Sequence, residues 1–391
     1  MSETDTHDLE LGRMQKSALM AGIIGSFVLV ATAARNPDQF FRSYLLGYVF
    51  WIGLPLGSLG LLMLHHLTGG GWGFVIRRLC EASTRTFLVM AVLFLPIAAG
   101  MSKLYLWMQP EWAAEAHSGL KAVYLSRDFF LGRAVFYFAI WILLGTLLSR
   151  WSLEEDGTRD PAAHHRMENL SAPGLLLYGF TTTFAVIDWV MSLEPHWFST
   201  IFGMIFIIVQ VLSAMAFSIL MARRLADRTP PLAAVASPAR FHDLGNLLFA
   251  FVMLWAYLSF CQFLLIWSGN LKEEIPWYMS RARGAWAGVA VFLLVFHFAV
   301  PFLVLLNRPI KRRKHALAIV AGVLLVISMV DVYWLVVPAF LPQAPRVHAA
   351  DLAALVAIGG FWLWAFAGQL RGKPLVPLGD ARLEEAPEHG H

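Results

Sequence analysis

Ten stretches of about 20 mainly apolar residues divide this chain, and each is long enough to cross a bilayer as a helix. Within hydrocarbon, every backbone N–H and C=O group must find a partner inside its own segment, which favours α-helices. Charged residues make up only 14% of the sequence, whereas soluble domains contain about 25%. We therefore predict an all-α polytopic membrane protein with a single integral membrane domain over residues 1–391. The predicted spans are 17–34, 43–66, 86–106, 128–149, 173–192, 199–221, 244–267, 284–306, 316–338 and 351–370.

Lysine and arginine residues are divided unequally between the two sides of these spans. Of the 30, 20 fall on the side of the N-terminus and 10 on the opposite side, and the run RPIKRRK at 308–314 is the strongest cluster. Because cytoplasmic loops carry the excess of basic residues, we expect both termini in the cytoplasm. The net charge of +4 then reflects membrane topology and does not indicate nucleic-acid binding.

Two polar segments flank the spans on the predicted cytoplasmic side. Residues 1–16 are polar and acidic, which is unlike a cleaved signal peptide. Residues 371–391 form a polar, proline-rich tail, which we expect to lie along the surface of a partner.

The cysteine and histidine pattern predicts that this chain binds no metal or redox cofactor. Cys80 and Cys261 are far apart, which excludes a Cys-ligated iron–sulfur cluster, and no CxxCH motif for c-type haem is present. His65 and His66 are adjacent, so both cannot face one haem, and His297 has no histidine partner at its depth.

Asp188 is the most informative single residue, because it lies inside the apolar stretch GLLLYGFTTTFAVIDWV. An ionised aspartate at the bilayer centre costs at least about 2.5–3.5 kcal/mol. Such residues face protein or water, where they handle protons, ions or polar ligands. Asp331, in VISMVDVYWLVVP, has nearly as apolar a setting.

Other polar residues of the spans fall into two groups by depth. Two groups of protonatable residues, one open to each side, are what a pair of proton half-channels needs, and histidine titrates near neutral pH. The group toward the N-terminal side contains His65, His66, His242, Asp243 and Asn246, with His297 nearer the middle, and the opposite group contains Asp188, Gln262, Asp331, Tyr333, Lys103, Arg133 and Tyr137.

The same residues allow simpler interpretations. His65 and His66 fit interfacial positions, and His297 fits a packing role. Asp188 and Asp331 fit static ion pairs with Arg133 or Lys103, because buried acids usually pair. A quinol head group needs a hydrogen-bond acceptor and a donor near the opposite interface. Asp188 with His196, or Asp331 with Tyr333, would supply them.

Three segments carry a family resemblance. They are DWVMSLEPHWFSTIFG at 188–203, LGNLLFAFVMLWAYLSFCQFLLIWSGNLKEEIPWY at 244–278 and GSLGLLMLHHLTGGGWGFVIRR at 57–78. Together they resemble the F subunit of bacterial alternative complex III, a quinol:electron acceptor oxidoreductase, and the likeness extends along most of the chain. That subunit is itself similar to the polysulfide-reductase (NrfD-like) membrane subunits.

The resemblance implies two four-helix bundles, from spans 2–5 and 6–9, with the first and last spans peripheral. It implies a subunit without a redox cofactor, in the bacterial inner membrane, within a respiratory or photosynthetic complex that oxidises menaquinol or ubiquinol. The implied partners are a homologous ten-span sister subunit, an iron–sulfur subunit and c-type cytochromes, which hold the iron–sulfur clusters and haem c. Its candidate proton path falls on Asp188, His196 and the polar face of the seventh span.

Four functions therefore remain open from the sequence. The first is a proton path coupled to quinol oxidation, and the second is quinol binding by this chain. The third is a structural scaffold whose buried acids are merely paired. The fourth is a secondary transporter, but Pro55 and Pro96 form no matched pair of broken helices in two halves, as an inverted repeat would require.

Overall fold

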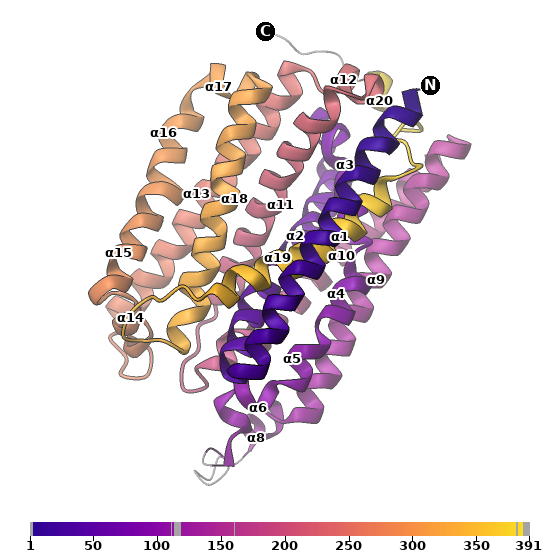
Figure 1. Cartoon of the computed structure of the whole chain (residues 1–391). Coiled ribbons are helices and arrows are strands. Elements are labelled where there is room, and N and C mark those ends of the chain that lie inside the picture. Colours follow the sequence, from indigo (N-terminus) through magenta and orange to yellow (C-terminus); the bar gives the residue numbers. More distant parts are fainter. Residues whose placement is uncertain (1–2, 111, 113–118, 160, 381, 386–391) are drawn as a thin grey trace.

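The computed structural model describes residues 3–110, 112, 119–159, 161–380 and 382–385, whose regular structure is entirely helical. Within these residues, ten helices or helix series are long and apolar enough to cross a membrane, which confirms the predicted fold class (Figure 1). The α-helices of the first half are α1 (Glu3–Arg35), α2 (Pro37–Thr68), α3 (Gly71–Thr84), α4 (Phe87–Leu93), α5 (Leu95–Ala99), α6 (Met101–Leu104), α8 (Leu120–Tyr124), α9 (Arg127–Thr158) and α10 (Pro161–Trp189). Those of the second half are α11 (Phe202–Ala226), α12 (Pro230–Val235), α13 (Pro238–Gly269), α14 (Ile275–Arg281), α15 (Gly284–Leu293), α16 (Val300–Leu306), α17 (Arg308–Arg312), α18 (Lys314–Val336), α19 (Ala349–Leu370) and α20 (Arg382–Glu385).

The third span differs most from its predicted position. Its helical series begins at Gly71 and runs to Ala99, whereas the sequence predicted 86–106. Arg77, Arg78 and Glu81 make 71–85 look like a loop, but in the interior the two arginines pair with Glu81 and with Glu155, Asp156 and Asp380. The series then bends at Thr86 and again near Pro96, where the chain divides into α4 and α5.

Two helical bundles pack side by side. One contains α2, α3–α5, α9 and α10, and the other contains α11, α13, α15–α16 and α18, so the packing follows the expected grouping. They meet along α2 and α11, where a Cβ atom on Gly57 would lie only 2.1 Å from the carbonyl oxygen of Gln210. A glycine is therefore required at this contact, as is common where membrane helices approach closely.

The first and last spans, α1 and α19, cross in front of these bundles as a tightly packed pair (Figure 1). Small residues form their contact. An added Cβ atom would lie 2.7 Å from the backbone nitrogen of Ala357 at Gly25, and 2.3 Å from that of Gly22 at Gly360. The helices thus touch through their backbones, which favours van der Waals packing in lipid.

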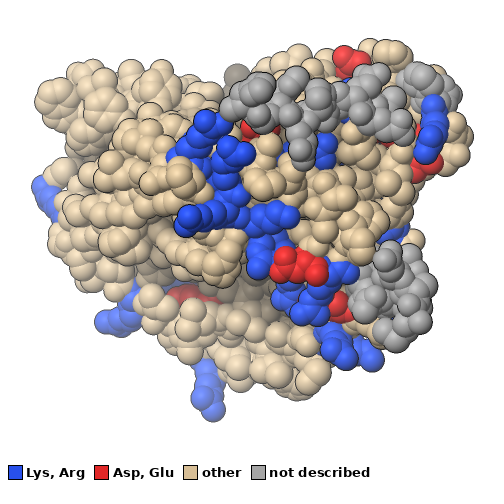
Figure 2. Space-filling view, turned by 90° about the horizontal axis from the view of Figure 1, so that it is seen from above, with Lys and Arg blue, Asp and Glu red and all other residues tan. Residues whose placement is uncertain are grey.

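The start of α1 and the short helix α20 lie at the same end of the molecule, which we call the N-side face (top of Figure 1). Lys and Arg residues gather on this face (Figure 2). The sequence led us to expect the tail on the surface of a partner, and its described part makes contacts with its own chain. Leu375 and Val376 are buried, and Gly379 N–H donates to Asp156 at 3.0 Å. The tail therefore packs on its own chain.

The eighth span contains an irregularity at mid-membrane. Residues Leu294–Ala299 form a π-helical turn, η3, between α15 and α16, and His297 lies within it. Such turns often mark functional sites, because the extra residue per turn alters where side chains point.

Candidate functional site

A buried ion network lies near the N-side face, centred on Arg77. Its guanidinium donates to Glu81 at 3.1 Å, Glu155 at 2.7 Å and Asp380 at 2.9 Å, and also to Ser152 at 2.8 Å. The side chain of Arg77 is fully buried. The network therefore joins α3, α9 and the C-terminal tail around one charge.

Arg78 extends this network to Asp156 and shares Glu81 and Ser152 with its neighbour. The network was not predicted from the sequence, because Asp380 follows Arg77 by 303 residues. The only sign of the network in the sequence was the pair Arg77 and Glu81, which lie four residues apart and therefore share one face of a helix.

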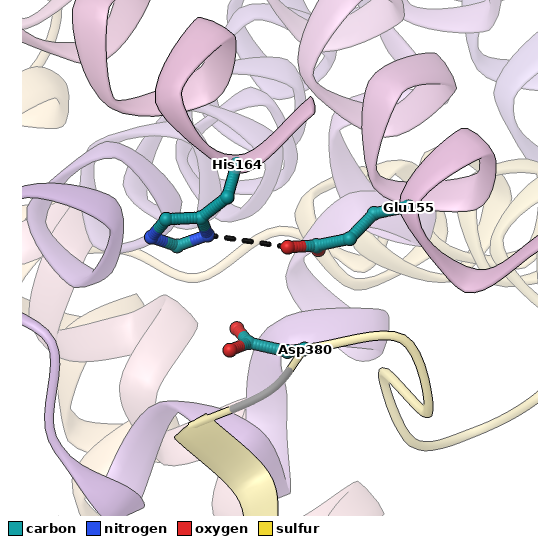
Figure 3. Close-up of side chains that lie close together, drawn as sticks. All are labelled: Glu155, His164 and Asp380. Atoms are coloured by element: carbon teal, nitrogen blue, oxygen red, sulfur yellow. Dashed lines mark ion pairs between the residues drawn. The ribbon is translucent and has the colours of Figure 1, made fainter. Parts of the chain in front are cut away.

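Glu155, His164 and Asp380 each bring one possible metal-ligand atom within 4.8 Å of the others (Figure 3). His164 Nδ1 lies 3.2 Å from Glu155 Oε1. However, Arg77 already donates to both carboxylates. Burial alone would raise the pKa of Asp380, but hydrogen bonds from Arg382 and the charges of Arg382 and Arg77 lower it to about 2. A divalent cation would face these positive charges, so we assign the three residues to the ion network.

Asp188, near the end of α10, is held in a complete ion pair. Arg133 Nε and Nη2 donate to its two carboxylate oxygens at 2.8 Å each, and Tyr137 O–H donates at 2.8 Å. The guanidinium also stacks over the rings of Tyr124 and Phe129. Bidentate pairing of this kind fixes both partners and neutralises the carboxylate.

Asp331, in α18, lies in a different setting. Trp255 Nε1–H donates to its carboxylate at 2.8 Å, and His297 Nδ1 lies 3.5 Å away without hydrogen-bond geometry. His297 Nε2 lies 3.4 Å from Ser328 Oγ. Among the described residues, no lysine or arginine forms an ion pair with Asp331. Within the described part of the chain, this carboxyl group therefore has a titratable neighbour and no fixed countercharge.

A cavity of about 660 Å³ reaches Asp331 from the membrane-facing side of the second bundle. Aromatic and aliphatic side chains of α13, α15 and α18 form most of its wall, and its volume falls in the usual range for ligand sites. Its polar lining includes Trp255, Gln262, Tyr278, Arg281 and Asp331. Arg281 is anchored by Glu194 at 2.8 Å and by the carbonyl of Leu335 at 3.1 Å.

The predicted residues of the N-terminal side do not form one group. His66 Nδ1 lies 3.1 Å from Ser171 Oγ, whereas both ring nitrogens of buried His65 lack a hydrogen-bond partner among the described residues. His242 contacts Asn246 at 3.4 Å and lies 3.7 Å from the half-exposed Asp243.

Several residues of the opposite side also lie apart from Asp188. Lys103 pairs with Asp38 at 3.2 Å on the surface, so it is not the partner of either buried acid. His196 is exposed and packs on Trp112, whereas Asp188 is buried in its ion pair. The suggested Asp188–His196 quinol site would therefore need one buried and one surface residue.

The two remaining candidates lie in the second bundle. Gln262 accepts a hydrogen bond from Ser199 at 3.2 Å beside the cavity. The ring of Tyr333 packs against Trp286 and does not line the cavity with Asp331.

Comparison with known proteins adds no family assignment. The sequence matches no protein-family model. No curated protein is significantly similar to it. The described residues show a ten-helix all-α polytopic membrane protein in which the buried acids Asp188 and Asp331 have different surroundings.

Proposed function

We propose that this chain is an integral membrane subunit of a quinol-oxidising electron-transfer complex and that Asp331 and His297 form its proton-exchange site. The observation that carries this proposal is the buried carboxyl group of Asp331, 3.5 Å from a histidine and without a lysine or arginine partner among the described residues. Intramembrane acids of this kind mark proton relays.

Asp188 supports a different role. Its charge is balanced by Arg133, and both carboxylate oxygens accept hydrogen bonds. A proton on Asp188 would displace these donors. We therefore assign Asp188 to the scaffold of the first bundle and the exchange of protons to the second bundle.

The surrounding complex is inferred from the resemblance to the F subunit of alternative complex III. In this proposal, menaquinol or ubiquinol is the substrate of the whole complex, and partner subunits hold the haem c and iron–sulfur clusters. Both termini, and hence the N-side face, lie in the bacterial cytoplasm. The basic residues gathered on that face support this orientation (Figure 2).

Asp331→Asn tests the proton-exchange site. Asparagine keeps the shape and can still accept the hydrogen bond from Trp255, so the fold is expected to persist. We expect proton transfer through the site to slow about 100-fold or more, as when other positioned acid–base groups are lost. Fewer protons should then be released for each quinol oxidised. The measurement is proton release per quinol oxidised by the complex in proteoliposomes, at matched electron flux.

Asp38→Asn is the matched control, because Asp38 is half-exposed and pairs with Lys103 on the surface. It should leave the proton ratio unchanged, and Asp331→Glu should restore part of it. An unchanged ratio in Asp331→Asn would leave this chain a scaffold and shift energy coupling to the sister subunit.

The cavity favours a second function, quinol binding by this chain. It opens toward the membrane, is mostly apolar and presents Asp331 as an acceptor, with Gln262 and Tyr278 nearer the opposite face. A quinol has an apolar tail and a ring with two hydroxyl groups, which match that lining. This function shares Asp331 with the proton-exchange site, since quinol oxidation releases protons.

A photoreactive quinone tests this second function. We expect it to label residues 253–263 or 277–282 of the cavity wall, and Ala290→Trp to remove the label by filling the cavity. Ala98→Trp, in the other bundle, is the control and should leave labelling intact. Labelling confined to a partner subunit would contradict quinol binding here.

A further inference from the structure

An apolar groove of about 630 Å³ runs along the lipid-facing side of the second bundle, away from the cavity described above. One wall is a stripe on α18, and the other is formed by α11 and by the α15–η3 helix. The groove is lined by His315, Ile319, Gly322 and Val326 of α18, by Leu220 of α11 and by Phe296 of η3.

The length of the groove matches one leaflet of a bilayer. The α18 stripe extends from His315 to Ile327, which is about 18 Å of helix at 1.5 Å per residue. Half of a hydrocarbon core is about 15 Å. At Gly322, in the middle of the groove, an added Cβ would be in ordinary van der Waals contact with Leu220, at 3.6 Å, so these two residues pack together along the groove. The length of the groove therefore suits one acyl chain.

The N-side end of the groove carries positive charge. His315 lines this end, and the exposed Arg312 and Arg313 lie three and two residues before it in the chain, separated from it by Lys314. Among the ion pairs of the described residues, none involves Arg312 or Arg313. Their charges thus remain available at the depth where phospholipid head groups lie.

We propose that this groove binds one anionic phospholipid of the N-side leaflet, with an acyl chain along α18 and its phosphate at Arg312 and Arg313. Basic residues at the membrane surface beside an apolar groove are suited to such head groups. The site is separate from Asp331 and does not depend on the function proposed for that residue.

Lipid retention tests this proposal on the full-length protein. The protein is placed in nanodiscs of equal parts phosphatidylglycerol and phosphatidylcholine with identical acyl chains, and then extracted in detergent. Mass spectrometry measures the lipids that remain bound. We expect preferential retention of phosphatidylglycerol, and a loss of about 25-fold in this preference in Arg312→Gln/Arg313→Gln, at about fivefold per basic residue.

Two further variants make the result specific. Val323→Trp fills the groove from a half-exposed position and should remove both lipids. Arg13→Gln/Lys16→Gln removes two charges on α1 and should change nothing. Equal retention of both lipids by the wild type would overturn the proposal. So would cross-linking of Val323→Cys to another protein chain in the native membrane, because a partner helix would then fill the groove.

Discussion

Replacing Arg77 with glutamine is expected to lower the free energy of unfolding by about 3–5 kcal/mol, because it leaves buried carboxylates without their cation. Arg77 is fully buried and bonds to Glu81, Glu155 and Asp380. Glutamine keeps part of the side-chain volume but supplies neither the charge nor the fork of donors. Thermal unfolding of the purified protein in detergent measures the change.

Arg166→Gln is the matched control, because it makes the same substitution in an exposed ion pair with Glu154. Surface pairs contribute about 0–1 kcal/mol, so only a small shift is expected there. If Arg77→Gln gives no folded protein, Arg77→Lys should give an intermediate stability, since it keeps the charge. Equal shifts for Arg77→Gln and Arg166→Gln would show that the network contributes little.

The second large effect concerns Asp188 and Arg133. Asp188→Asn and Arg133→Gln are each expected to destabilise the protein by about 3 kcal/mol, because each leaves its partner uncompensated. The double variant should cost less than the sum of the two, since it removes both charges together. The same unfolding measurement on all four proteins gives the coupling energy.

The double variant also separates the two roles considered for Asp188. If the pair is static, the folded double variant should release as many protons per quinol as the wild type. If the double variant folds normally but releases fewer protons per quinol, Asp188 belongs to the proton path. Additive single effects would show that the bidentate contact of 2.8 Å contributes no coupling.

The span pattern was predictable from hydropathy alone, because each helix must satisfy its backbone within the membrane. The boundary at 86 was wrong for a physical reason. Arg77 and Arg78 are polar by any residue scale, yet inside the fold their charges are balanced by Glu81 and by acids far along the chain. Hydropathy treats each residue separately and cannot register a charge that is neutralised by a distant partner.

The buried acids were also visible in the sequence, but their roles were not. Asp188 and Asp331 lie in similarly apolar stretches. Their roles differ because of Arg133, which lies 55 residues before Asp188 and pairs with that acid but not with Asp331. The neighbours of Asp331 come from α13 and η3, and only packing brings Trp255 and His297 to the same carboxylate.

The position of Asp380 has a consequence for how the chain is made. The ribosome synthesises Arg77 303 residues before this partner, so the early spans enter the membrane with an incomplete set of countercharges. Asp380 then completes the network near the N-side face. The interior of the first bundle is thus completed only once residue 380 has been made, and a premature stop before it would leave Arg77 without one of its buried carboxylates.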